Sequence, residues 1–447
     1  MTGASQIAGK AENRSAIPVA ICGAALMIVL AALLHALGVS LIVFALLLGS
    51  AALVWMMVRH PVASLGIVLA AMPVYPLAFL LGKFFGPSFV ASLAGADRVA
   101  LLLLVFILWW RNGIRLTAPD WFLLVCFALA VVRLAFGGMV IALLSDFNFM
   151  IAYAVGRMAA LSSEQENRWA KRAVWIVGIL SLLGLSEVFI LGAGPRTALY
   201  LAVAEGATDR GGLAATFSGE GLTALRESAT MFGPIQFASL CMVALIVWWV
   251  YSRNRWIAGM VATGLIGSVT RSAWLGTALA LPVLAVLMDQ TRRLLIYGVL
   301  GLALFAASIP VLGLGDYLVL AKTGQDYSTV GHSESLLAGV GYVLDHPLGA
   351  GPGNAGSYAT RNDMNGVFIE NTYLTLAAEY GIATSLCFLG FLFSALRVAW
   401  RERTQLGYTA VGILVGFGAV MFVAPLHQDF SLASWIWFPV GLAVRPR

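Results

Sequence analysis

The sequence predicts an all-α polytopic membrane protein, a transmembrane helix bundle of about 12 to 14 spans with a large helical loop on the outer face. Hydrophobic residues make up 60% of the 447 positions, only 11% are charged and the mean hydropathy is +0.90, so most of the chain is predicted to be dissolved in lipid. Apolar stretches of spanning length must be helical because the hydrocarbon core offers backbone amides no partners, and the alternating pattern of a membrane barrel is absent. We therefore expect one integral membrane domain over residues 1–447.

Fourteen apolar segments can be placed along the chain, although the ninth and last are short and the hairpin at 137–142 is tight, so twelve or thirteen crossings stay open. The segments are 16–37, 39–58, 62–82, 95–110, 119–137, 142–161, 173–192, 229–250, 256–270, 272–289, 294–314, 371–396, 406–424 and 430–444.

The net charge of +6 comes from short basic clusters beside apolar segments, a pattern typical of topology signals and not of nucleic-acid binding. With the N-terminus inside, every inner connection carries a basic residue, and both termini are predicted to be cytoplasmic. The inner basic residues are Arg59, Arg111, Arg115, Arg168, Lys171, Arg172, Arg253, Arg255, Arg292, Arg293, Arg397, Arg401 and Arg403.

The same register places three connections outside, namely the long loop 193–228, the short turn at Thr270-Arg271 and the long loop 315–370. Because functional residues concentrate in loops, we expect the chemistry on the outer face. The sequence has no Walker loop, and Gly349–Gly353 lacks the strand–turn–helix context of a dinucleotide site. No Asp-x-Asp or His/Cys cluster indicates a metal, so no cofactor is predicted.

Within the loop 315–370, five apolar residues at helical spacing predict an amphipathic helix near 333–345 on the membrane surface. They are Leu336, Leu337, Val340, Val343 and Leu344. Ser333 or His332 is expected to be its N-cap, and Pro347 with Gly349 is expected to end it.

Two residues of this loop are candidates for a general base. Glu370 borders an apolar segment, where partial loss of hydration favours the neutral acid, although an acid before a helix capped by Asn371 or Thr372 is an equally good interpretation. His332 could act as base or bind phosphate, although an interfacial histidine is the commoner occurrence.

Outer-face arginines are candidates for binding an anion. Arg271 stands between two apolar segments and needs a counter-ion, which a lipid-linked diphosphate would supply; an arginine snorkelling beside Trp274 is the alternative. Arg210, Arg226 and Arg361 are further candidates, each commonly explained as a solvated loop charge.

Four charged residues fall inside or at the ends of apolar segments. Arg133 and Arg157 lie near opposite segment ends and could snorkel, although Tyr153–Arg157 could also be a helix-packing element. Asp146 and Glu187 lie deeper, and the sequence names no partner for either acid.

Four short segments in this order resemble the O-antigen ligase and Wzy-type polysaccharide polymerase superfamily. They are Thr270–Trp274 opening an apolar segment, His346–Gly351 in the outer loop, Glu370–Leu374, and Ala377–Ile382 after it. The likeness covers about Leu225 to Val423, and the order is more specific than any single motif.

This resemblance implies a GT-C-like glycosyltransferase in the bacterial inner membrane, acting on the periplasmic side without metal or nucleotide. It implies that Arg271 binds the diphosphate of an undecaprenyl-diphosphate-linked oligosaccharide, with Arg210 or Arg226 as second arginine and Arg361 and Tyr373 as secondary substrate-binding candidates. Flippase and chain-length regulator proteins are the implied protein partners.

The chain departs from the ligases at one position. The ligases are similar to one another in having His-Asn before the Tyr-Leu, where this chain has Glu370-Asn371. A glutamate there, together with Gly331-His332 and Ser335, resembles the exopolysaccharide or capsule polymerases. We therefore expect a polymerase with inverting transfer, Glu370 as first choice of base and His332 in reserve. Transfer to lipid A core by a ligase is the alternative, and a secondary transporter or flippase, or a non-catalytic scaffold, are rivals from other classes.

Overall fold

The computed structural model describes residues 49, 52–81, 96–192, 194, 216–219, 222–231, 233–312, 315, 319, 327–356, 359 and 367–446. Contacts divide the chain into two compact units, Met1–Ser64 and Leu65–Arg447. Of the first unit, residues 49 and 52–64 are described, so the first two predicted spans fall largely outside the described residues. Everything below concerns the second unit.

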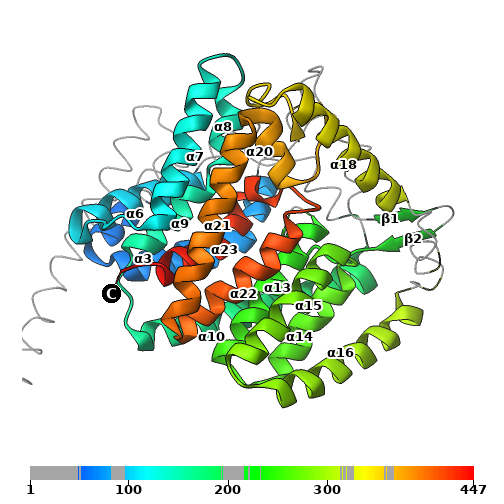
Figure 1. The fold of residues 1–447 in the computed structure, drawn as a ribbon. Helices are drawn as coiled ribbons and strands as arrows, with labels where there is room; N and C mark the ends of the chain where they lie inside the picture. Colours follow the sequence, from blue (N-terminus) through cyan, green and yellow to red (C-terminus); the bar gives the residue numbers. More distant parts are fainter. Residues whose placement is uncertain are drawn as a thin grey trace, which may run out of the picture. The chain divides into compact units, whose positions relative to one another are not determined.

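Helices make up nearly all of the described part of this unit (Figure 1). In chain order they are α3 (Pro61–Ala71), the 3₁₀ helix η1 (Met72–Leu81), α6 (Ala96–Asn112), α7 (Ala118–Leu134), α8 (Val140–Asp146), α9 (Phe149–Met158), α10 (Ser163–Ser186), the π-helical turn η2 (Glu187–Leu191), α13 (Pro234–Tyr251), α14 (Arg255–Gly267), α15 (Arg271–Leu287), α16 (Thr291–Val311), α18 (Tyr327–Asp345), α20 (Thr372–Tyr380), α21 (Ile382–Glu402), α22 (Gln405–Val420), the short 3₁₀ helix η3 (Leu426–Gln428) and α23 (Phe430–Ala443).

Several of these helices have the length and hydropathy of membrane spans. Among the described residues, Ser163–Leu191, Pro234–Tyr251, Thr291–Val311 and Ile382–Glu402 are long and apolar enough to cross a bilayer, and the bent pair α8–α9 makes a fifth candidate. Shorter apolar helices cover Pro61–Leu77, Arg271–Leu287, Gln405–Val420 and Phe430–Ala443. The prediction of a helical membrane protein is confirmed at this level, and the number of crossings stays a prediction.

Two predicted spans are broken. Segment 142–161 divides into α8 and α9, which meet at an angle of 44°. Segment 371–396 divides into α20 and α21 at Gly381, whose φ of +93° only glycine adopts readily. The backbone of Leu348 presses against Gly381, and a Cβ there would lie 2.9 Å from the Leu348 carbonyl carbon. A returning loop therefore causes the second break.

The two long loops, 193–228 and 315–370, also differ in detail from the sequence predictions. The amphipathic helix begins at Tyr327 and not near 333, so the prediction that His332 or Ser333 caps it is wrong: both lie in its second turn. The loop 193–228 contains a two-stranded antiparallel hairpin, β1 (Thr216–Gly219) and β2 (Leu222–Leu225), which adds a small β element to the helical fold.

Glycines bring two pairs of helices into backbone contact. A Cβ on Gly156 of α9 would clash with the Phe438 carbonyl oxygen of α23, and one on Gly441 would clash with the Tyr153 carbonyl oxygen. Likewise, a Cβ on Gly276 of α15 would lie 2.7 Å from the carbonyl oxygen of Gly416 on α22. Close helix packing at small residues is the usual means of association in lipid, and Tyr153–Arg157 is the packing element that its sequence allowed.

An aromatic core lies beside the α9–α23 contact. Trp437 is fully buried, with its ring centroid 4.9 Å from that of Phe149 and 5.5 Å from that of Phe391. Phe388 of α21 completes the group, 5.8 Å from Phe149. This core fixes α9, α21 and α23 relative to one another.

Replacement of Gly441 by alanine is expected to separate α9 from α23, because the added methyl would overlap the Tyr153 carbonyl. We expect a loss of about 1–3 kcal/mol in the free energy of unfolding, the usual cost of overpacking. Thermal unfolding in detergent measures it. Gly298→Ala in exposed α16, where nothing lies within 4 Å of the new methyl, is the control and should not lower the melting temperature.

Candidate functional site

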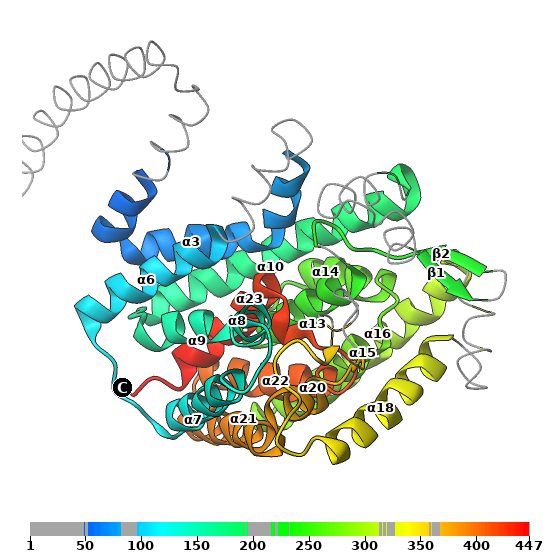
Figure 2. The same ribbon diagram turned by 90° about the horizontal axis from the view of Figure 1, so that it is seen from above.

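The later part of the loop 315–370 is fixed on the turn between α7 and α8. The Arg133 Nε donates to the Gly349 carbonyl at 2.8 Å, and the Met139 amide donates to the Pro352 carbonyl at 2.8 Å. Arg133, which could have snorkelled, therefore binds the backbone of this loop. Figures 1 and 2 show this turn, α18 and α20 at one end of the unit.

Two predicted candidates for the base, His332 and Glu370, are paired. The His332 Nδ1 contacts the Glu370 Oε2, and the two side chains are 34% and 29% exposed. His332 lies in α18, whereas Glu370 lies in the extended segment before α20. The pair is thus partly exposed and joins two segments of the loop 315–370.

Ser335 aligns the two segments that carry this pair. Its hydroxyl donates to the Phe368 carbonyl at 3.1 Å and accepts from the Glu370 amide at 3.0 Å. Beneath it, fully buried Ile369 packs against Gly339, where a Cβ would lie 3.2 Å from the isoleucine side chain. The backbone around Glu370 is therefore held against one face of α18.

Asn371 is the N-cap of α20, as the sequence allowed: its Oδ1 accepts from the Leu374 amide at 3.0 Å. Its Nδ2 donates to the Phe422 carbonyl at 3.0 Å, which ties the helix start to the chain after α22. Since Asn371 fills the capping position, the Glu370 carboxylate is left to pair with His332.

Arg226, one of the predicted arginine candidates, bonds the residues that precede Arg271. The Arg226 Nε donates to the Ser268 carbonyl at 2.9 Å, and its Nη2 donates to the Thr270 Oγ1 at 3.0 Å. Thr270 is the residue before Arg271, which begins α15. Arg226 therefore lies beside the positive end of the α15 dipole, next in space to the position of Arg271.

The other predicted candidates contribute less to this arrangement. Arg210 and Arg361 lie outside the described residues. Tyr373 is 9% exposed, and its hydroxyl donates to the Gly418 carbonyl at 2.9 Å while its ring lies 4.8 Å from that of Phe422. The contacts of Tyr373 thus join α20 to α22.

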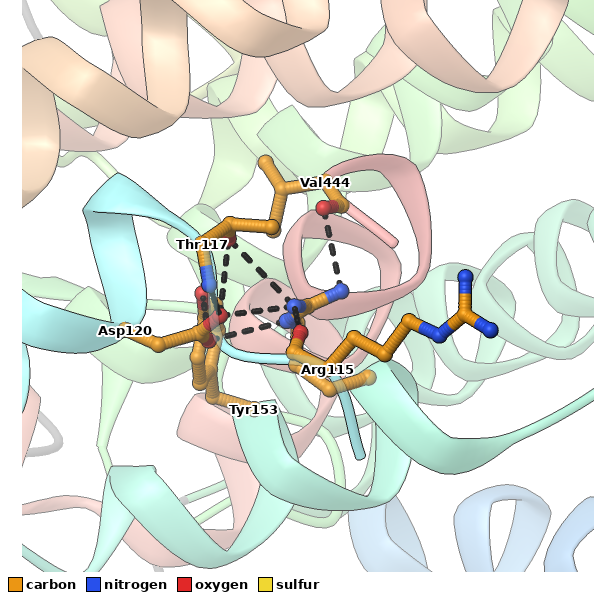
Figure 3. Close-up of polar contacts among 6 residues, drawn as sticks. Arg115, Thr117, Asp120, Tyr153 and Val444 are labelled. Atoms are coloured by element: carbon orange, nitrogen blue, oxygen red, sulfur yellow. Dashed lines mark hydrogen bonds and ion pairs between the residues drawn. The ribbon is translucent and has the colours of Figure 1, made fainter. Parts of the chain in front are cut away.

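Of the two interpretations open for Arg157, snorkelling and helix packing, the structure supports helix packing. Arg157 is 2% exposed and forms an ion pair with Asp120 at 2.6 Å, with further hydrogen bonds to the carbonyls of Arg115 and Val444 (Figure 3). Tyr153 donates to the same carboxylate at 2.9 Å. A buried guanidinium needs a paired carboxylate and full hydrogen bonding, and this network ties α7 and α9 to the end of α23.

A buried polar network around Asp146 went unrecognised in the sequence. Asp146 is fully buried at the end of α8, where its Oδ2 accepts from the Tyr380 hydroxyl at 2.6 Å and its Oδ1 accepts from the Gln428 Nε2 at 2.5 Å. The His427 Nε2 lies 3.4 Å from the same Oδ1. Asp146 stood out as a deep acid, but its partners are more than 200 positions away in the chain, beyond any local pattern.

Two further contacts extend this network. The Glu379 carboxyl faces that of Asp146 and accepts from the Ala355 amide at 3.2 Å. The Thr372 hydroxyl donates to the Ala424 carbonyl, and the His427 Nδ1 lies 3.2 Å from that hydroxyl, so the network extends to the first turn of α20.

No protein-family model matches this chain, and no curated protein matches it. Among the described residues, no group of three or more His, Cys, Asp or Glu side chains is arranged to hold a metal ion. The functional interpretation therefore depends on the geometry of the polar groups themselves.

Replacing Ser335 by alanine removes both hydrogen bonds that align residues 368–370 on α18. We expect amide hydrogen exchange at Ile369 and Glu370 to rise about fivefold, corresponding to the ~1 kcal/mol contribution of a hydrogen bond. Ser333→Ala is the matched control, because Ser333 only bonds the Val330 carbonyl within the same helix. Equal exchange in both variants would contradict the aligning role of Ser335.

Proposed function

We propose that this chain is a membrane-embedded polysaccharide polymerase. It transfers an undecaprenyl-diphosphate-linked glycan to a sugar hydroxyl of another lipid-linked repeat unit, by metal-independent inverting transfer at the periplasmic face of the bacterial inner membrane. The His332–Glu370 pair is the observation that carries the proposal, because it unites two residues chosen independently as candidates for the base. The proposed GT-C-like character of the bundle rests on the sequence resemblance.

The pair supplies a base for the acceptor. With the His332 Nδ1 turned toward the Glu370 carboxylate, the imidazole tautomer is fixed and the Nε2 is the atom that accepts a proton. The acceptor oxygen gives up its proton to this nitrogen and bonds to the anomeric carbon of the donor. The bond from that carbon to the diphosphate oxygen breaks, and its electron pair leaves with the diphosphate. Pairing favours His332 as acceptor of the proton and Glu370 as the group that orients it, the reverse of the order expected from the sequence.

The Arg226–Thr270–Arg271 cluster supplies the anion site. Charge grows on the diphosphate as its bond to the sugar breaks, and prearranged guanidinium groups at a helix N-terminus stabilise such charge without reorganising. Arg226 reaches this position from the end of the hairpin β1–β2, whereas Arg271 begins α15. These arginines take the role that a metal fills in many phosphate-transferring enzymes.

The contacts between segments support the proposed topology. Residues predicted on the outer face contact one another, as Arg133 with Gly349 and Asn371 with Phe422 do. The basic residues of the opposite connections include Arg293, which bonds the carbonyls of Trp249 and Ser252. Membrane lipids, the lipid-linked oligosaccharide, a flippase and a chain-length regulator are the partners that the proposal requires.

Reconstitution of the purified chain with lipid-linked repeat units tests the reaction. A ladder of longer lipid-linked glycans is expected of a polymerase, whereas transfer only to lipid A core would indicate a ligase. Neither product, with folded protein and the correct repeat unit, would contradict both activities.

His332→Asn and Glu370→Gln are expected to lower the transfer rate by on the order of 10²- to 10⁴-fold, the usual share of general acid–base catalysis. Arg271→Ala should lower it by on the order of 10²- to 10³-fold. The double variant of the pair should be little worse than His332→Asn alone, because the two residues act as one unit. Rates are measured on reconstituted protein with equal membrane insertion.

Glu334→Gln is the control, since Glu334 is exposed on the same helix, and it should keep the full rate. Full activity in either variant of the pair would remove that residue from the proposed mechanism.

The Asp146–Glu379–His427 network favours a second candidate function, a proton-coupled transporter or flippase. Fully buried ionisable residues in a membrane bundle mark proton or ion pathways in many transporters, and broken helices such as α8–α9 surround their sites. This network connects to the first turn of α20 through Thr372.

Proteoliposomes with a pH gradient test the transporter. If the network couples proton movement to transport, a gradient should drive a labelled lipid-linked glycan across the bilayer, and Asp146→Asn should abolish the flux because one carboxyl of the network is lost. Asp345→Asn, an exposed acid at the end of α18, is the control. Absence of flux in protein that polymerises glycan would rule out this candidate.

A further inference from the structure

Glu227 occupies a closed notch next to the arginine cluster. Its side chain is fully buried, and neither carboxyl oxygen has a hydrogen-bond partner among the described residues. A Cβ at Gly184 of α10 would lie 2.9 Å from its Oε2, and a Cβ at Gly267 of α14 would overlap its Oε1. Two glycines on different helices therefore make the space that this one carboxyl fills.

A second acid faces the same notch. Glu187 begins the π-helical turn after α10, and its Oε2 accepts from the Ser228 amide at 3.3 Å. Cys241 of α13 is the other titratable group that interacts electrostatically with Glu227. Arg226 directly precedes Glu227 in the chain. Burial, and then the charge of Glu187, raise the pKa of Glu227 to about 9. At neutral pH the Glu227 side chain is therefore the uncharged acid.

Glu227 and Arg226 are attached side by side to the end of α14. The Glu227 amide donates to the Gly267 carbonyl at 3.0 Å, and the Arg226 Nε donates to the next carbonyl, that of Ser268, at 2.9 Å. Because these two bonds are consecutive, movement of Glu227 out of the notch would pull the Arg226 guanidinium away from Thr270. An ionised Glu227 would be an unpaired buried charge beside a second acid, and it would be driven toward water.

We propose that Glu227, as the neutral acid, is a positioning residue for the anion site of Arg226 and Arg271, so that the site is intact only while this carboxyl keeps its proton. The inference rests on the proposed function in assigning the anion as the diphosphate of a lipid-linked glycan. Three observations carry it: the glycine notch, the bonds from the Glu227 amide and the Arg226 Nε to two consecutive carbonyls, and the adjacent acid.

The test uses the full chain in nanodiscs, with inorganic pyrophosphate as the probe and thermal stabilisation as the readout between pH 6 and pH 10. Wild-type protein is expected to lose apparent pyrophosphate affinity at least tenfold as pH rises through about 9, the pKa of Glu227. Glu227→Gln, which is neutral at every pH, should change less than twofold over this range, so the comparison corrects for titration of the probe.

Stability provides a readout that does not depend on the anion. Between pH 4.5, the usual pKa of glutamate, and a pH of about 9, Glu227 keeps in the folded protein a proton that it has released in the unfolded chain. The free energy of unfolding therefore falls as the pH rises through this window. Glu227→Gln should lack this decline and melt above wild type at pH 9. This result would stand even if no glycan transfer were found, which separates failure of this inference from failure of the proposed function.

Gly267→Ala provides a second variant, since its methyl would displace the Glu227 carboxyl at any pH. It should weaken pyrophosphate binding at least tenfold at pH 7, whereas Gly259→Ala on the same helix, with nothing within 4 Å, should bind as wild type does.

Loss of binding in Glu227→Gln at pH 7 would show that a charged carboxylate is required and would overturn the proposal. The proposal would also be overturned, in favour of a cation site, if Mg²⁺ or Na⁺ stabilised the wild-type protein and Glu227→Gln abolished this stabilisation.

Discussion

The position of α20 is the constraint on which two polar sites depend, the His332–Glu370 pair and the buried network around Asp146. This helix of nine residues is capped by Asn371, which also bonds the chain after α22, and it ends at Gly381 against the backbone of Leu348. Glu370 just before it pairs with His332, while Glu379 and Tyr380 at its other end join the buried network. One short helix thus carries part of a partly exposed pair at its start and part of a buried polar network at its end.

Satisfaction of polar groups explains most of the remaining interior contacts. In lipid a charged side chain cannot reach water, so Arg157 is surrounded by the Asp120 carboxylate and by backbone carbonyls. Arg293 instead lies among the rings of Trp248, Trp249 and Tyr297, at 4.6 to 5.7 Å from their centroids. Both arginines join helices that come from distant parts of the chain, so charge in this protein serves helix assembly as well as topology.

Glycine has three separate roles in the fold. At Gly156 and Gly441 it allows two helices to touch at the backbone, and at Gly381 it allows a positive φ that ends a helix. At Gly267 it leaves space for the Glu227 carboxyl of another segment. In each case the missing Cβ matters because of the atom that faces it, which belongs to a different part of the chain.

The sequence by itself determined the helical membrane character, the approximate bounds of most helices and a cap at Asn371 or Thr372, because hydropathy and capping are local properties. It also selected His332, Glu370, Arg226 and Arg271 as candidates by residue type. Only the tertiary structure decided that His332 pairs with Glu370, that Arg226 reaches Thr270, and that Asp146 meets Tyr380, His427 and Gln428. Such pairings depend on how helices pack and where they break, and the backbone contacts behind the break at Gly381 come from residues more than 30 positions away in the chain.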